Sequence, residues 1–272
     1  QRQMCIRDRF CSYYLVTMNN GPTIHQPRIS YEHFKREISA RVSTTLEDAI
    51  RSHIPVDESF YASLFEIRAD KAARVGRLRD AVAALSLSLF GQEITSDHIK
   101  AIAAGELYNM ASYFQNWHLD DKKNVTSPLD AKRCHIASHL YREIAHRLVA
   151  ETSFNPEIKA QLTDGLSSSN YAIQRGQLTE LESMTIDKLI PRSSEQGAER
   201  TFMDTYAARC YGFAGGFYGL TFAMGAIMAG KDATIVEAFR SIGEDFGIAL
   251  QMVNDVGDFS LSRSVANAPE KD

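Results

Sequence analysis

Glycine, proline and excess positive charge are all scarce in this sequence. It holds 16 glycines and 7 prolines in 272 residues, and runs with strand-like alternation are few, which favours an all-helical protein. Its 30 Lys and Arg stand against 34 Asp and Glu, a formal net charge of −4. A dedicated nucleic-acid-binding protein is therefore not expected, and an anionic ligand must be met by local basic groups or by metal ions.

Paired cysteines and membrane-length apolar runs are missing as well. Cys5, Cys11, Cys134 and Cys210 form no CxxC pair and no metal-ligand spacing, which indicates free thiols in a reducing compartment. The most apolar stretch, residues 213–230, contains several glycines and a tyrosine, and this predicts a buried helix rather than a membrane span. No secretory signal opens the chain, so we expect a cytoplasmic protein that is not integral to a membrane.

The apolar content of 44% and the small net charge argue against disorder and predict a folded domain with a buried core. We expect that domain in residues 21–272. Residues 1–20 lack helical periodicity, and the opening QRQMCIRDRF resembles translated adapter or vector sequence, so we expect a non-native or disordered leader there.

From Ser30 onward, apolar residues recur at the spacing of a helix. In the first predicted helix they fall on every fourth position, at Phe34, Ile38, Val42, Leu46 and Ile50. A short helix should end at Gly91, and a longer one should begin at Ser96 as N-cap. Ser127–Pro128 and Asn155–Pro156 are start signals for two more helices, the second running towards Met184. Further helices are predicted over residues 202–210, 213–230 and 233–259, which completes one all-α domain.

The last predicted helix carries two stripes of side chains. Phe246, Leu250, Val253 and Val256 form an apolar stripe, and beside it Gln251, Asn254, Asp255 and Asp258 fall at i, i+3, i+4 and i+7. Carboxylates that share a face repel each other unless a cation joins them, and hard oxygen ligands suit Mg²⁺. The alternative is a solvated helix face. The apolar neighbouring sequence argues against it, because it predicts a helix buried all round.

A second polar stripe lies on the helix that is predicted to begin at Ser96. Asn109, Asn116 and Asp120 share a face at i, i+7 and i+11, and Asp121 follows. Lys122 and Lys123 come next and can meet an anion; the alternative is an ordinary helix C-terminus whose lysines complement the dipole. If both acidic stripes face each other inside one helical bundle, they bracket a cavity that can hold Mg²⁺ ions and a diphosphate.

Five segments, in order along the chain, resemble motifs of the polyprenyl synthetase family, the trans-isoprenyl diphosphate synthases of the class I isoprenoid synthase fold. VGRLRD at 75–80 is similar to GKRLRP, Glu106-Leu107 to the helix before the first aspartate motif, RGQLTEL at 175–181 to GQxxDL, GAIMAG at 225–230 to GAxxxG, and ALQMVNDVGDF to FQxxDDxxD. Their common register makes the resemblance specific.

The resemblance implies a bundle of antiparallel helices around a central cavity, usually dimeric, as a homodimer or with a homologue. It implies Mg²⁺-dependent ionisation of an allylic prenyl diphosphate and condensation with isopentenyl diphosphate or another acceptor. The implied catalytic residues are Asp120, Asp255 and Gln251, and the implied metal ligands are Asn116, Asp120, Asp121, Asn254, Asp255 and Asp258. The implied diphosphate-binding residues are Arg77, Arg79, Asn109, Lys122, Lys123 and Gln177.

The chain also departs from the family pattern. The first motif reads NWHLD and the second NDVGD; Gly76 replaces a lysine, Asn109 a histidine, and Phe213 and Ala214 a Lys-Thr pair. The family continues past the second motif with a basic segment and closing helices, so we expect the domain to be truncated at its C-terminal end.

Three functions stay open: a divergent prenyltransferase, a class I terpene synthase-like enzyme, and a catalytically inactive partner subunit of a prenyl diphosphate synthase.

Overall fold

The structure is a computed structural model that describes residues 31–54, 58, 78–119, 131–183 and 198–258. The chain divides into residues 1–33 and residues 34–272, and the helical bundle belongs to the second of these units. Every described element is a helix, which confirms the predicted all-α class.

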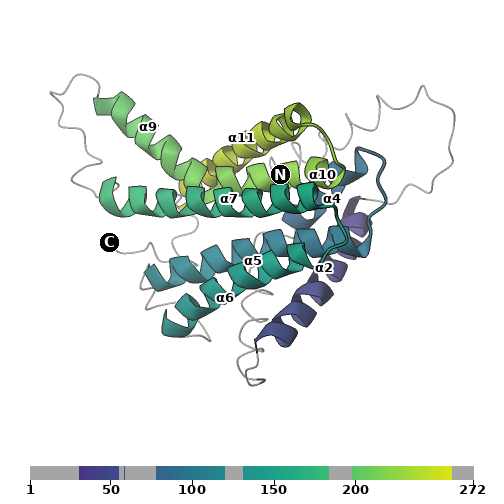
Figure 1. Ribbon diagram of the computed structural model, residues 1–272. Coiled ribbons are helices and arrows are strands. Elements are labelled where there is room, and N and C mark those ends of the chain that lie inside the picture. Colours follow the sequence, from purple (N-terminus) through teal and green to yellow (C-terminus); the bar gives the residue numbers. More distant parts are fainter. Residues whose placement is uncertain (1–30, 55–57, 59–77, 120–130, 184–197, 259–272) are drawn as a thin grey trace. The chain divides into compact units, whose positions relative to one another are not determined.

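Nine helical elements occur in the described part of the chain, and the predicted helices correspond to them closely. Their bounds are α2 (Tyr31–His53), α4 (Leu78–Ser88), α5 (Ser96–Leu119), α6 (Ala131–Ala150), α7 (Pro156–Ser183), α9 (Ala198–Cys210), the π-helix η1 (Tyr211–Gly215), α10 (Gly216–Met228) and α11 (Ala233–Asp258) (Figure 1). None of these helices is long and apolar enough to cross a membrane.

The helix starts follow the capping rules, with one shift. The Asn155 Oδ1 accepts the N–H of Ile158 at 2.9 Å, as predicted for the start of α7. The cap of α5 is Thr95 rather than Ser96, because the Thr95 carbonyl accepts the N–H of Ile99 at 3.2 Å. The Thr95 N–H donates to Nδ1 of His98 at 3.1 Å, and the His98 N–H donates back to Oγ1 of Thr95 at 3.5 Å, which is a reciprocal pair of the capping-box kind. The predicted start at residues 127–128 lies outside the described residues.

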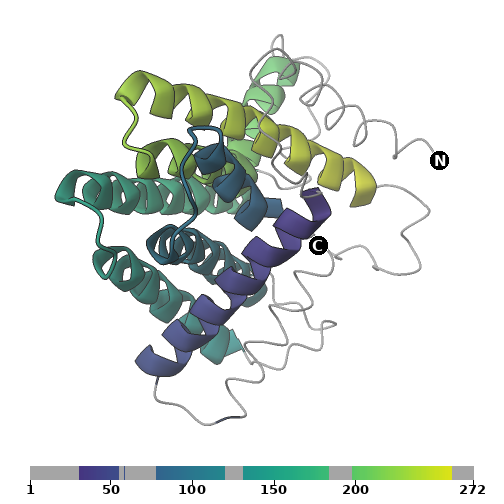
Figure 2. The ribbon, with the colours of Figure 1, turned by 90° about the vertical axis from the view of Figure 1, so that its right-hand side faces the viewer.

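Helix α7 lies between two groups of helices. It contacts α5 and α6 on one side and η1 and α10 on the other, and α11 packs along α10 (Figures 1 and 2). Apolar side chains of α2, α5, α6 and α10 form most of the core, with α4 and α7 contributing to it. The predicted stripe of α2 is confirmed: Ile38, Val42, Leu46 and Ile50 are buried, and Phe34 is half-buried.

Glycines set the closest approaches between helices. A Cβ on Gly176 of α7 would lie 2.7 Å from the Cα of Gly212 in η1, so the two backbones touch there. Gly225 of α10 meets the backbone of Ser86 and Leu87 in α4 in the same way. Gly176 of RGQLTEL and Gly225 of GAIMAG therefore serve the packing of helices against one another.

The prediction that the last helix is buried all round is wrong. Val253 and Val256 of α11 are 67% and 71% exposed, and Phe246 is 38% exposed. The buried face instead follows Gly243 and Gly247, each of which touches the backbone of the preceding helical run. One turn further on, the same face carries Gln251 and then Asp255. Backbone packing at glycines thus turns Gln251 and Asp255 inward and leaves Val253 and Val256 outside, and Asn254 of the polar stripe is exposed as well.

Candidate functional site

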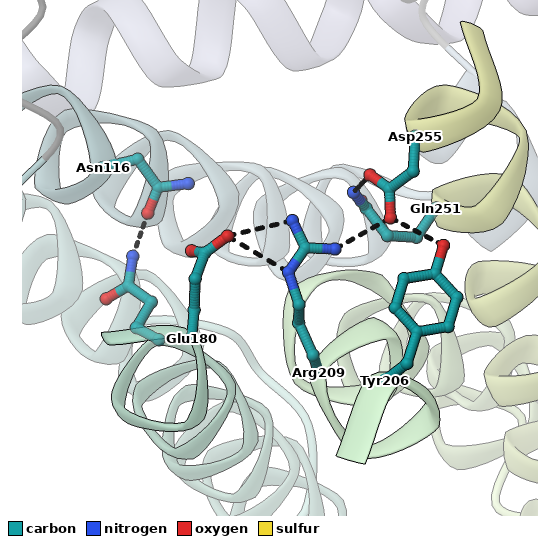
Figure 3. Close-up of polar contacts among 7 residues, drawn as sticks. Asn116, Glu180, Tyr206, Arg209, Gln251 and Asp255 are labelled. Atoms are coloured by element: carbon teal, nitrogen blue, oxygen red, sulfur yellow. Dashed lines mark hydrogen bonds and ion pairs between the residues drawn. The ribbon is translucent and has the colours of Figure 1, made fainter. Parts of the chain in front are cut away.

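Two carboxylates on different helices share one guanidinium group. Arg209, in the last turn of α9, donates from Nη1 to Oδ2 of Asp255 on α11 at 2.8 Å. It also donates from Nη2 and Nε to Oε1 of Glu180 on α7, at 2.9 and 3.1 Å (Figure 3). The side chains of Arg209 and Asp255 are 15% and 16% exposed, and that of Glu180 is 38% exposed. This is a partly buried ion-pair network rather than a surface salt bridge.

Both oxygens of the Asp255 carboxylate are engaged. The Tyr206 hydroxyl donates to Oδ2 at 2.8 Å, and the Gln251 Nε2 donates to Oδ1 at 2.8 Å (Figure 3). Tyr206 lies one turn before Arg209 on α9, and Gln251 lies one turn before Asp255 on α11, so each helix brings two polar side chains to the same place. The sequence places Gln251 and Asp255 on one face of the helix, and the contact between them lies on that face.

The network stabilises the charged form of Arg209 and the neutral form of Tyr206. Burial opposes the charged form of Arg209, but the Glu180 and Asp255 carboxylates outweigh it, and the pKa of the guanidinium is raised. Burial, together with the hydrogen bond to Asp255, raises the pKa of Tyr206, so its phenol stays neutral. The Phe213 ring lies under the guanidinium, with 4.9 Å between the Arg209 Cζ and the ring centroid.

The local backbone explains why these side chains meet. α9, η1 and α10 follow one another without a break, and η1 is a wide π-turn, a feature that often occurs at functional sites. Gly212 in this turn touches Gly176 of α7. Arg209 stands one turn before Gly212 and Glu180 one turn after Gly176, so the glycine crossing brings the two side chains within reach.

A cluster of amide side chains joins α5, α6 and α7. Gln177 of α7 donates from Nε2 to Oδ1 of Asn116 on α5. Gln115 donates to Oε1 of Gln177 at 2.9 Å, and Arg142 of α6 donates to Oε1 of Gln115 at 2.6 Å. Gln177 and Glu180 are three residues apart on α7, so one turn of this helix serves both the amide cluster and the Arg209 network.

The predicted diphosphate-binding residue Arg79 forms a buried ion pair. Its Nε lies 3.2 Å from Oε2 of Glu106, and the two side chains are 13% and 11% exposed. Burial opposes the charge of Arg79, but Glu106 outweighs it and raises the pKa of the guanidinium. Asn109, one turn further along α5, buries its Nδ2 with no hydrogen-bond partner in the described part of the chain. Both residues therefore face the inside of the bundle.

The structure thus brings together four of the predicted site residues in two pairs, Asn116 with Gln177 and Gln251 with Asp255. Asn254 is exposed, and nothing is described of the side chain of Asp258. Arg77, Asp120, Asp121, Lys122 and Lys123 lie outside the described residues, and their roles stay predictions.

Sequence reasoning missed Glu180, Tyr206 and Arg209. Glu180 had a signal, because it occupies the acidic position of the segment that resembles GQxxDL. Arg209 had none: its two partners lie 29 and 46 residues away in the sequence, and only the helix crossing brings them together.

The oxygen donors fit Mg²⁺ in chemistry but are already bonded. Asp255 and Glu180 offer the hard carboxylate oxygens that Mg²⁺ prefers. Among the residues that the structure describes, no group of three or more His, Cys, Asp and Glu side chains is placed to hold a metal ion. A metal that takes Oδ2 of Asp255 or Oε1 of Glu180 therefore competes with Arg209 for that oxygen.

A comparison with family profiles matches residues 130–272 to the family described as polyprenyl synthetase. The chain belongs to the polyprenyl synthetase family. The matched region contains α6 to α11, and hence Gln177, Glu180, Arg209 and Asp255. No curated protein matches the chain.

Several solved structures have a similar fold. A geranylgeranyl pyrophosphate synthetase from Pyrococcus horikoshii has a TM-score of 0.66 at 20% identity, covering 85% of this chain and 68% of that one. A decaprenyl diphosphate synthase from Rhodobacter capsulatus has a TM-score of 0.63 at 18% identity, covering 85% and 67%. A geranylgeranyl pyrophosphate synthase from Corynebacterium glutamicum, complexed with calcium and isoprenyl diphosphate, has a TM-score of 0.64 at 16% identity, covering 89% and 68%. This chain spans about two thirds of their length, and its fold is of the isoprenoid synthase type.

Proposed function

We propose that this polyprenyl synthetase family member is a prenyltransferase that acts on an allylic prenyl diphosphate with Mg²⁺. One observation carries the proposal: a single turn of α7 contacts the first polar stripe directly and is joined to the second through Arg209. Gln177 bonds to Asn116 of the first stripe, and Glu180 is joined through Arg209 to Asp255 of the second. A ligand bound beside this turn meets groups from both stripes, which is the arrangement that the family resemblance implies.

Each group has a defined part in this proposal. The Gln177 and Gln251 amides and the Arg209 guanidinium can donate to diphosphate oxygens. Asp255 would hold Mg²⁺ with Asp258, Asn254 and the predicted ligands of the first stripe. Bound Mg²⁺ supplies charge stabilisation for the leaving diphosphate.

The reaction proposed for this site begins when the carbon–oxygen bond of the allylic diphosphate breaks and diphosphate leaves with the electron pair. The allylic cation is then attacked by the double bond of isopentenyl diphosphate or of another acceptor, which afterwards loses a proton. In this proposal, buried apolar side chains of α10, such as Phe217 beside the predicted diphosphate-binding Arg79, would keep water from the cation. We propose that the protein acts as a homodimer or with a homologue, in the cytoplasm.

A second candidate function is a catalytically inactive partner subunit. It is favoured by the bonds that Asp255 and Asn116 already make to Arg209 and Gln177, because a metal ion must compete with these partners for the same oxygens. In this case the acidic stripe serves the stability of the bundle, and an active homologue supplies the chemistry.

One assay separates these functions. The purified chain is incubated with Mg²⁺ and geranyl or farnesyl diphosphate, with and without isopentenyl diphosphate, and the products are separated by chromatography. Longer prenyl diphosphates support the prenyltransferase. Hydrocarbons or alcohols formed without acceptor indicate a terpene synthase-like enzyme. Activity that appears only with a homologous subunit indicates the partner function.

Two variants link the product to this site. Asp255→Asn should abolish product formation, because it removes the negative charge with which Asp255 would hold Mg²⁺. Asp245→Asn is the matched control, since Asp245 is an exposed acid on the same helix. An Asp255→Asn variant as active as Asp245→Asn would contradict the proposed site.

A further inference from the structure

We propose that Arg209 is an internal counter-ion of Glu180 and Asp255, which a divalent cation must displace before it can bind these carboxylates. The inference rests on the proposed function, because it concerns the same site. It adds that the chain regulates access to its own carboxylates.

The geometry of the network supports this role. The guanidinium donates one bond to Asp255 and two to Glu180, with donor–acceptor distances from 2.8 to 3.1 Å. A guanidinium presents its donors in a fixed planar fork, so one arginine can hold carboxylates from two helices at once. The Tyr206 and Gln251 bonds also engage the two oxygens of Asp255. A cation that approaches the carboxylates therefore competes with Arg209 for Oδ2 of Asp255 and for Oε1 of Glu180.

The charge balance favours a divalent ion over the arginine. One guanidinium faces two carboxylates, so one of their two negative charges is left uncompensated in this network. A divalent cation compensates both, and it takes oxygen ligands from carboxylates and water at the same time. When the cation binds, however, the charge-assisted hydrogen bonds between Arg209 and the carboxylates are broken, and each of them is stronger than a hydrogen bond between neutral groups. Arg209 thus lowers the affinity for the metal without removing the site.

After displacement, the Arg209 guanidinium can still contact the ring of Phe213. Phe213 lies in the π-turn just after Arg209, and its ring supports the guanidinium at 4.9 Å from Cζ to centroid. This contact does not depend on either carboxylate. A guanidinium that leaves Glu180 and Asp255 can therefore remain beside the site, where the diphosphate of the proposed substrate can receive its hydrogen bonds.

The test measures metal binding directly, with Mn²⁺ as the probe and electron paramagnetic resonance as the readout, on the full chain without substrate. Arg209→Gln removes the internal cation. Arg175→Gln makes the same charge change on α7, at an exposed arginine that stacks on Tyr171. We expect Arg209→Gln to bind Mn²⁺ about tenfold more tightly than the wild type, a difference of about 1.4 kcal/mol. We expect Arg175→Gln to bind it as the wild type does.

Equal Mn²⁺ affinity of the wild type and Arg209→Gln overturns the inference, and so does the absence of binding in both. If Arg209→Gln does not give a folded protein by circular dichroism, Arg209→Lys takes its place. The lysine keeps the charge but loses the fork, so its affinity for Mn²⁺ should still exceed that of the wild type, and an unchanged affinity again overturns the inference.

The outcome of the product assay and the outcome of the metal-binding measurement are independent of each other. Turnover by the wild type together with unchanged metal affinity in Arg209→Gln contradicts only the counter-ion role. Tighter metal binding by Arg209→Gln, together with no turnover by the wild type under any condition, supports the counter-ion role and contradicts the proposed enzyme.

Discussion

Gly176 of α7 and Gly212 of η1 meet backbone to backbone: a Cβ added to Gly176 would lie 2.7 Å from the Cα of Gly212 and 3.0 Å from its carbonyl carbon. This crossing fixes where α7 and the π-turn run side by side. The Glu180–Arg209 contact stands one turn from the crossing on each element, so the packing of two glycines positions the candidate site.

The first prediction follows from this crossing. Gly176→Ala should lower the free energy of unfolding by about 1–3 kcal/mol, because backbone atoms must move apart to admit a methyl group. Gly105→Ala on α5 is the control, since its nearest neighbour is the flexible end of Met224 at 3.2 Å. Alanine favours a helix over glycine by about 1 kcal/mol, so this control should be neutral or stabilising. Urea unfolding measures both, and equal stability of the two variants would contradict the close crossing.

The second prediction concerns the pH dependence of stability and His98 at the start of α5. Burial is the largest effect on this side chain and lowers its pKa below the ordinary value of 6.5. The unfolded chain therefore binds the proton more readily than the folded one, and stability rises with pH below 6.5. The contribution is complete above that value and is lost as the pH falls through it.

The variant His98→Gln isolates this effect, because glutamine can still accept the Thr95 N–H that His98 accepts at 3.1 Å. Thermal melting at pH 5 and pH 7.5 should show a smaller difference in Tm for the variant than for the wild type. An unchanged difference would mean that other groups cause the acid sensitivity.

The third prediction concerns the buried pair of Arg79 and Glu106. Glu106→Gln leaves a buried guanidinium without its carboxylate, and the free energy of unfolding should fall by about 3–5 kcal/mol. Glu37→Gln removes the acid of a solvent-exposed pair with Arg41, whose atoms lie 3.9 Å apart. Exposed ion pairs of this kind contribute little to the free energy of unfolding, so the Glu37→Gln control should leave the urea midpoint unchanged. A small effect of Glu106→Gln would show that Arg79 faces solvent or an open site.

The positions of the helices were predictable because local signals determine them. The apolar spacing of α2 and the Asn155–Pro156 start of α7 are encoded within a few residues, and both predictions are confirmed. The pairing of Gln251 with Asp255 follows from helix geometry alone. The partners of Arg209 could not be predicted, since they depend on where two helices cross.

The hydrophobic pattern of the sequence also did not predict which face of α11 turns inward. An analysis of hydrophobic periodicity depends on large apolar side chains. This helix instead packs through Gly243 and Gly247, which have no side chain and therefore do not contribute to the periodic pattern. Val253 and Val256, which the sequence predicted to be buried with the rest of the helix, are exposed. Small residues that allow backbones to approach can therefore outweigh a stripe of larger ones.

The fourth prediction tests this orientation of α11. Val253 and Val256 are 67% and 71% exposed, so changing both to threonine should alter the free energy of unfolding by no more than about 0.5 kcal/mol. Val42→Thr makes the same chemical change in the core, where Val42 has no exposed surface. A buried hydroxyl without a partner costs about 1–3 kcal/mol, which urea unfolding resolves. If the Val253→Thr and Val256→Thr pair destabilises the protein as much as Val42→Thr does, the apolar stripe of α11 is covered in solution and the inward face assigned to Gln251 and Asp255 is wrong.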